Sequence, residues 1–123
     1  MFCGAGGGIR EAVEGAGGCC YSAKHLRRRT ANFDPRSEDG KAILAWLYGL
    51  EKPCGVMVYY DLLAARLLEL CRGAGIRVPG EVAILGVGDD PTFCEFSAPG
   101  LSSVQHDLPR IGYEGARLLD RMM

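Results

Sequence analysis

Two continuous apolar runs, at residues 55–60 and 82–87, constrain this chain most strongly. They read GVMVYY and VAILGV, and neither alternates between polar and apolar residues. Runs that are apolar on both faces are typical of strands buried inside a parallel sheet. The segment between them carries apolar residues at helical spacing over residues 62–71 and closes at Gly73 and Gly75. A strand–helix–strand unit of this kind predicts two parallel strands joined by a helical crossover.

Capping and turn residues define the remaining predicted elements. Ser37, Asp61 and Asp107 are the expected N-caps of three helices, because short polar side chains satisfy the free amides of a first turn. Pro109 stands in the first turn of the last helix, where proline is tolerated. The other expectations are helices at about 9–16, 38–50 and 108–122, short strands at 18–23 and 101–105, and a loop over 88–100.

Helices and strands therefore alternate along most of the chain. This order predicts an α/β fold, with a three-layer arrangement in which helices cover both faces of a parallel sheet. A length of 123 residues suits one domain. The 14 basic and 15 acidic residues give a net charge of −1, which excludes a strongly basic nucleic-acid module. No apolar stretch approaches the roughly 20 residues that cross a membrane, so no membrane contact is expected.

Acidic side chains follow both apolar runs. Asp61 comes directly after the first run, next to Tyr59 and Tyr60, and Asp89 and Asp90 follow the second. Parallel α/β sheets bind ligands outside the carboxyl ends of their strands, where these residues would lie. Carboxylates there could perform acid–base catalysis, hold Mg²⁺ or accept hydrogen bonds from sugar hydroxyls, and a tyrosine would suit the apolar face of a sugar ring. A small metal-dependent enzyme that uses Asp61, Asp89 and Asp90 thus stays open at this point. A non-binding dimerisation remnant stays open as well, as does the simpler role of Asp61 as a helix cap.

Six cysteines are present, but their spacing does not indicate disulfides or a metal site. Cys19 and Cys20 are adjacent, and no Cys-x-x-Cys pair occurs. We therefore expect reduced, mostly buried thiols, with no metal and no cofactor. The first residues show no basic segment before an apolar stretch, so no signal peptide is expected and the cytoplasm is the predicted compartment.

Four segments resemble a known family in both order and spacing. They are PCGVMVYYDLLA at 53–64, AGIRVPGEVAILGV at 74–87, PGLSSV at 99–104 and GYEGARLL at 112–119. Together they resemble the C-terminal part of the sensor domain in lactose/galactose-repressor-type transcription regulators. The sequence Leu-Ser-Ser-Val at 101–104 and the segment from Trp46 to Pro53 are most similar to those of the xylose-operon regulators. These regulators join this sensor to an AraC-type DNA-binding domain.

The resemblance implies one lobe of a type I periplasmic-binding-protein-like fold, which binds a sugar between two lobes. Residues of about 8–106 would form the C-terminal lobe and about 107–122 a final crossover helix, with no DNA-binding domain inside the chain. Asp61 matches the family's acid after the strand, which commonly bonds the sugar. Gly88 stands where the first acid of a Gly-x-Asp-Asp pattern is expected. The implied ligand set is Tyr60, Asp61, Asp89 and Asp90.

The resemblance also implies the partners. The ligand would be a sugar, with a pentose favoured by the similarity to xylose regulators, and the protein would sense it without catalysis. DNA would be contacted only through a domain outside this chain. The last helix would pack against an N-terminal lobe or a second copy of the chain through Leu108, Ile111, Leu119 and Met122.

Overall fold

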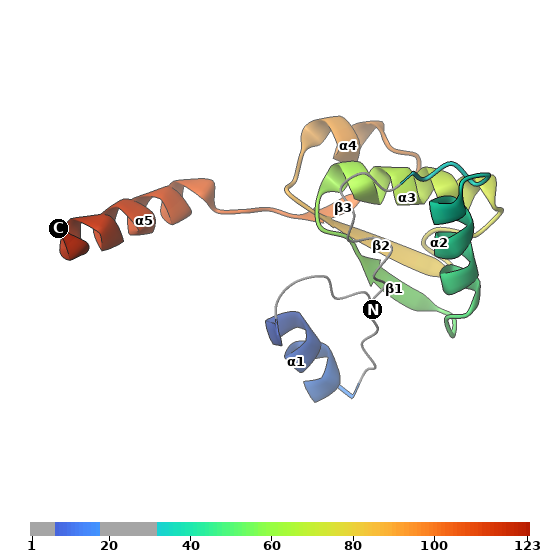
Figure 1. The fold of residues 1–123 in the computed structure, drawn as a ribbon, viewed down its shortest axis with the longest axis horizontal. Helices are drawn as coiled ribbons and strands as arrows, with labels where there is room; N and C mark the ends of the chain where they lie inside the picture. The colour runs from blue at the N-terminus through green and yellow to red at the C-terminus, as the bar shows by residue number, and fades with distance from the viewer. Residues whose placement is uncertain (1–6, 18–31) are drawn as a thin grey trace.

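A computed structural model describes residues 7–17 and 32–123 of the protein (Figure 1). The predicted strand at 18–23 lies outside the described residues, as do Cys3, Cys19 and Cys20. The described thiols, Cys54, Cys71 and Cys94, are free. The elements in chain order are α1 (Gly7–Gly15), α2 (Glu38–Tyr48), β1 (Cys54–Met57), α3 (Asp61–Gly73), β2 (Val82–Val87), α4 (Pro91–Phe96), β3 (Ser102–Val104) and α5 (Leu108–Met122).

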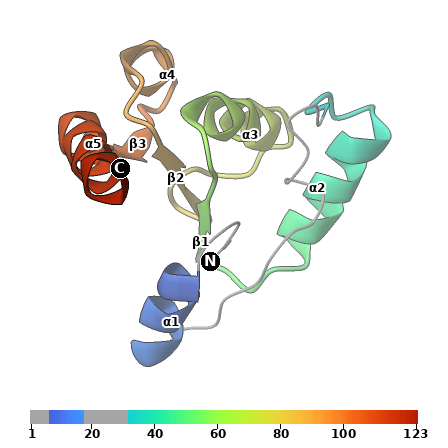
Figure 2. The same cartoon turned by 60° about the vertical axis from the view of Figure 1, so that its left-hand side comes forward.

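The strands form a parallel sheet in the order β1-β2-β3. Val56 of β1 lies opposite Ile84 of β2, and Gly86 of β2 lies opposite Ser103 of β3. Helix α3 lies on one side of this sheet and α1 on the other (Figures 1 and 2). The predicted α/β fold with parallel strands is confirmed.

The core lies between the sheet and the helices α2 and α3. Strands β1 and β2 contribute Val56 and Val82 to it, and Val58 follows β1 directly; the relative exposures of the three are no more than 1%. Helix α3 places its buried residues three and four positions apart, so that one stripe faces the sheet. Burial of each large aliphatic side chain stabilises the fold by about 1.5–3 kcal/mol. The helical residues of this core include Ile43, Leu47, Leu63, Ala64, Leu67, Leu68, Leu70 and Cys71.

Two of the three predicted caps are confirmed. The Ser37 side chain accepts a hydrogen bond from the amide of Gly40 at 3.0 Å, and the Asp107 side chain accepts one from Arg110 at 3.1 Å. The prediction that Asp61 caps α3 is wrong. Tyr60 occupies the N-cap position without a side-chain cap bond, and Asp61 is the first helical residue, with its side chain directed elsewhere.

The segment 88–100 is not the continuous loop that was expected. It contains the short helix α4, which begins at Pro91 behind an Asp90 N-cap whose side chain accepts from Thr92 at 2.9 Å. A capping aspartate followed by proline is a known start signal for a helix. Because α4 has only six residues, it presents no apolar periodicity that would have revealed it.

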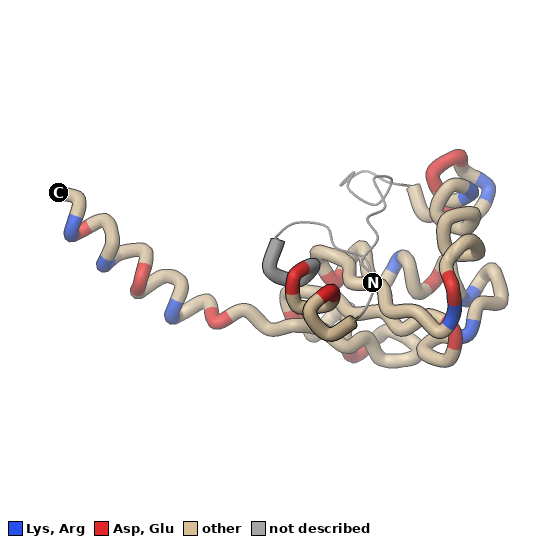
Figure 3. Tube along the Cα trace, turned by 90° about the horizontal axis from the view of Figure 1, so that it is seen from below, with Lys and Arg blue, Asp and Glu red and all other residues tan. Residues whose placement is uncertain are grey.

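Helix α5 projects away from the sheet, and each of its residues is exposed (Figure 1). Basic and acidic residues alternate along it (Figure 3). Its apolar side chains are exposed as well, with Leu108 at 67% and Met122 at 74%. None of the helices at 7–17 or 32–123 is long and apolar enough to cross a bilayer.

Candidate ligand-binding site

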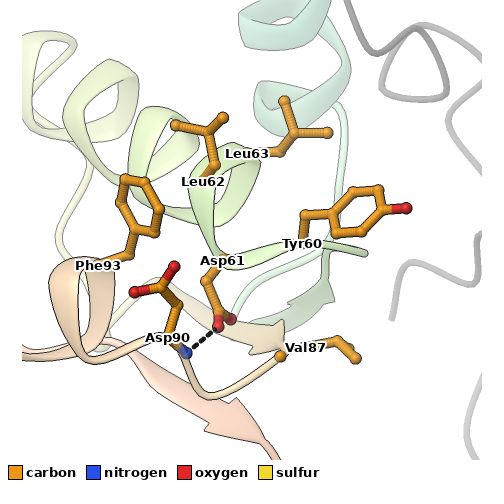
Figure 4. Close-up of a pocket in the computed structure, with 8 residues that line it drawn as sticks. Tyr60, Asp61, Leu62, Leu63, Val87, Asp90 and Phe93 are labelled. Carbon is orange, nitrogen blue, oxygen red and sulfur yellow. Dashed lines mark hydrogen bonds between the residues drawn. The ribbon is translucent and has the colours of Figure 1, made fainter.

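A cavity of about 460 Å³ opens beyond the carboxyl ends of β1 and β2. Its position is the one at which parallel α/β sheets bind ligands. Strand β2, the turn after it and helices α3 and α4 supply its walls (Figure 4). Three of the predicted site residues, Tyr60, Asp61 and Asp90, lie there together. The other lining residues are Leu62, Leu63, Val87, Gly88 and Phe93.

The Asp61 side chain is buried at this edge of the sheet, with only 3% of the residue exposed. One carboxylate oxygen, Oδ2, accepts a hydrogen bond from the backbone amide of Asp90 at 2.8 Å. The other, Oδ1, accepts one from the Ser103 hydroxyl at 2.6 Å. Asp61 therefore connects the start of α3 both to the turn after β2 and to strand β3.

Ser103 extends this network by one further bond. Its hydroxyl donates to Asp61 and accepts from the amide of Asp89 at 3.0 Å. The backbone amides of two consecutive residues thus donate to this network: that of Asp89 to Ser103 and that of Asp90 to Asp61. Among the described residues, no buried side-chain nitrogen or oxygen lacks a hydrogen-bond partner. Ser103 was not among the predicted site residues.

Two glycines make room for the Asp61 carboxylate. A Cβ atom on Gly86 would collide with Asp61 Oδ1, and one on Gly88 would lie 3.1 Å from Oδ2. Gly88 also has a φ of +133°, which side-chain-bearing residues rarely adopt. A side chain at position 88 would therefore intrude on the space in which the Asp61 carboxylate lies.

Asp89 and Asp90 follow each other in sequence but play different parts. Asp89 has a φ of +57° and does not line the cavity. Asp90 does line it, and one of its carboxylate oxygens, Oδ1, accepts from Thr92. The side chain of Asp90 is exposed, which leaves its second oxygen accessible from the cavity.

Aromatic rings stand on two sides of the carboxylates. In Figure 4 the rings of Phe93 and Tyr60 lie to either side of the pair formed by Asp61 and Asp90. Tyr60 is 44% exposed and its ring centroid lies 4.3 Å from that of Tyr59. The sequence interpretation missed Phe93, although the Asp90-Pro91 start signal would have placed it in the first turn of a helix.

No group of three His, Cys, Asp or Glu side chains that could hold a metal occurs in the described part of the chain. Partial burial raises the pKa of the Cys94 thiol, and the carboxylates of Asp61, Asp89 and Asp90 raise it further.

The strands and helices define an α/β domain with a cavity at the carboxyl ends of its parallel strands. The chain belongs to the family of periplasmic binding protein-like domains, whose family model matches residues 5–123. This match confirms the resemblance to the repressor-type sensor domains that the sequence motifs indicated.

Known relatives are named as transcription regulators. The xylose operon regulatory protein of Haemophilus influenzae is 30% identical over 70% of this chain and 22% of its own length. The HTH-type transcriptional regulator DegA of Bacillus subtilis is 28% identical over 93% of this chain and 32% of its own length. The arabinose metabolism transcriptional repressor of Geobacillus stearothermophilus is 34% identical over 59% of this chain and 20% of its own length.

The chain thus spans between about a fifth and a third of the length of these relatives. No solved structure matches the chain significantly. The relatives named here are regulators and not enzymes, so the metal-dependent enzyme that the sequence left open is not favoured.

Proposed function

We propose that this chain is the sugar-binding part of a transcription regulator that controls sugar-utilisation genes. The observation that carries the proposal is the cavity at the strand ends, where the Asp90 carboxylate faces a space walled by Tyr60 and Phe93. Ligand sites of this kind combine apolar walls with a few placed polar groups. A pentose is the favoured ligand, because two of the relatives are named for xylose and arabinose.

Binding would use hydrogen bonds and ring contacts without any covalent step. An ionised carboxylate is a strong acceptor and suits the hydroxyl donors of a sugar. Aromatic rings suit the apolar C–H face of the same molecule. A ligand that binds one arrangement of the protein more tightly than another shifts the balance between them, and this shift would be passed to a DNA-binding domain.

Helix α5 is the proposed contact with a second lobe or a second copy of the chain. Ile111 and Leu119 are 58% and 62% exposed, and with Leu108 and Met122 they form one apolar stripe. An exposed apolar stripe of this size on a soluble domain indicates an interaction surface. In this proposal residues of about 8–106 form one lobe and about 107–122 the crossover to its partner. A regulator of this kind would act in the cytoplasm, and DNA would be bound by another part of the protein.

A titration of the ¹⁵N-labelled chain with D-xylose and L-arabinose tests the proposal, because amide shifts report even millimolar binding. We expect concentration-dependent shifts at Tyr60, Asp90 and Phe93, and none with sugar-free buffer of matched viscosity. Phe93→Ala should weaken the response by more than about tenfold, as the loss of an aromatic contact worth about 1.5 kcal/mol would.

Phe96→Ala is the matched control, since Phe96 lies on the same helix but is 84% exposed and does not line the cavity. It should leave the response unchanged. The absence of any sugar-dependent shift in the unmodified chain would contradict the proposal. Equal weakening by the two alanine variants would contradict the location of the site.

A further inference from the structure

We propose that Asp61 is a positioning residue, which holds the turn at 88–90 and strand β3 in place for the ligand and does not itself accept a ligand hydroxyl. This inference rests on the proposed function and assigns roles within its site. It departs from what the family resemblance implied for Asp61, namely direct contact with the sugar. Three independent features of the site carry it.

The first feature is the use of the carboxylate inside the protein. Each Asp61 oxygen already accepts one short hydrogen bond, from the Asp90 amide at 2.8 Å and from the Ser103 hydroxyl at 2.6 Å. With 3% of the residue exposed, little of the carboxylate surface can reach a ligand. The side chain borders the cavity, but its acceptors face the protein.

The second feature is the floor beneath the carboxylate. Gly86 and Gly88 leave the space in which the carboxylate sits, since a Cβ atom at either position would meet it. In Figure 4 the side chain of Asp61 is directed at the backbone of Asp90, away from the ring of Tyr60. The carboxylate is therefore packed against the main chain of β2 and its following turn.

The third feature is the backbone on either side of this network. Tyr60 has a φ of +83° and Asp89 a φ of +57°, and both bear side chains. Such conformations are unfavourable for residues with side chains and persist where surrounding contacts hold them. Asp61 follows Tyr60 directly and is joined to Asp89 through Ser103. The network therefore binds the backbone of Asp89 and begins at the residue that follows Tyr60.

Together these features divide the site into a holding part and a contacting part. Asp61 and Ser103 hold the turn, which fixes the direction of the Asp90 side chain and the start of α4. Asp90, Tyr60 and Phe93 are then the groups that face a ligand.

Amide hydrogen exchange tests the holding role without any ligand. Asp61→Ala should speed exchange at Asp89 and Asp90 by more than tenfold, while the Val58 amide, bonded to Leu85 across the sheet at 2.9 Å, keeps its protection. Asp61→Asn should restore protection, because an amide side chain can still accept from Asp90 and pair with Ser103. Asp120→Asn, on the exposed helix α5, should change nothing.

Ser103→Ala keeps the test decisive if Asp61→Ala does not fold. It removes the acceptor of the Asp89 amide and leaves that of Asp90, so only Asp89 should exchange faster. Unchanged protection at Asp89 in Ser103→Ala, or at both amides in Asp61→Ala, would overturn the inference.

The sugar titration supplies the second arm. A positioning role predicts that Asp61→Asn keeps the xylose response of the unmodified chain within about threefold. A loss of more than about tenfold, with amide protection intact, would mean that the charged carboxylate contacts the sugar directly and would overturn the inference. If the unmodified chain shows no response to sugar, the proposed function fails, while the exchange pattern still decides whether Asp61 holds the turn.

Discussion

Gly86 lies in the middle of the sheet, directly beneath the Asp61 carboxylate. Gly86→Ala should lower the free energy of unfolding by about 1–3 kcal/mol, because the added methyl group collides with a carboxylate that is held by two hydrogen bonds. Urea unfolding of the purified chain measures this. In an Asp61→Ala background the same substitution should be far less destabilising, since the colliding group is gone.

Gly55→Ala is the control on a neighbouring strand. A Cβ atom there meets nothing within 4 Å, so the variant should be neutral or slightly more stable. An equal loss of stability from Gly86→Ala in both backgrounds would contradict the packing of Asp61 against Gly86.

Cys71 gives the chain a pH dependence at the alkaline end. Burial in the core is the main cause that raises the pKa of the Cys71 thiol from 9.0 to about 11. The nearby Cys54 thiol is a smaller cause in the same direction. Above the lower value the unfolded chain loses this proton while the folded chain keeps it, so stability falls as pH rises from about 9 to about 11. Cys71→Ala should flatten this part of the curve of unfolding free energy against pH. Parallel curves for the two proteins would contradict the assignment.

At the scale of elements, α4 shows how one residue serves both structure and site. Asp90 caps the helix through Thr92 and also lines the cavity. Asparagine is an equally good cap, so Asp90→Asn should keep the unfolding free energy within about 0.5 kcal/mol yet weaken sugar binding. Asp90→Ala should lose about 1 kcal/mol of stability as well. Denaturant unfolding and the sugar titration separate the two effects, and equal sugar responses of Asp90→Asn and the unmodified chain would argue against a contact by the charged carboxylate.

The elements were largely predictable from sequence, because their signals are local. The runs at 55–60 and 82–87 are apolar on both faces, and they became β1 and β2. Helix α4 was not predicted, since six residues are too few to show periodicity. The role of Asp61 was also out of reach, because its partners Asp90 and Ser103 lie 29 and 42 residues away and only the fold brings them together.

Tyr60, Asp61 and Asp90 lie together at one edge of the sheet, because parallel strands end on the same side, and their contact with a ligand stays a prediction. Asp89 was expected there too, but a backbone conformation with positive φ directs its amide to Ser103 and leaves it outside the cavity lining. A sequence pattern can place a residue at the end of a strand. It does not show which way the backbone amide and side chain of a single turn residue point.

In the molecule as a whole, helix α5 contributes no buried residue to the fold. None of its residues is buried, so substitutions on its apolar stripe should leave the unfolding free energy of the core unchanged. We expect the chain to self-associate through this stripe, and Leu119→Asp should shift it towards monomer in sedimentation equilibrium. Arg117→Ala, which removes a charge that pairs with Glu114 at 3.2 Å, should not. A chain that is monomeric at all concentrations would contradict self-association through α5.

The proposed sugar site lies in the cavity between Tyr60, Asp90 and Phe93. The most direct measurement is an isotope-filtered nuclear Overhauser experiment with ¹³C-labelled xylose and the unlabelled chain. A sugar bound in this cavity should give cross-peaks between its C–H protons and the ring protons of Phe93, and none to the ring of Phe96 on the outer side of the same helix. Cross-peaks to Phe96 alone, or none to any residue of the cavity at saturating sugar, would contradict it.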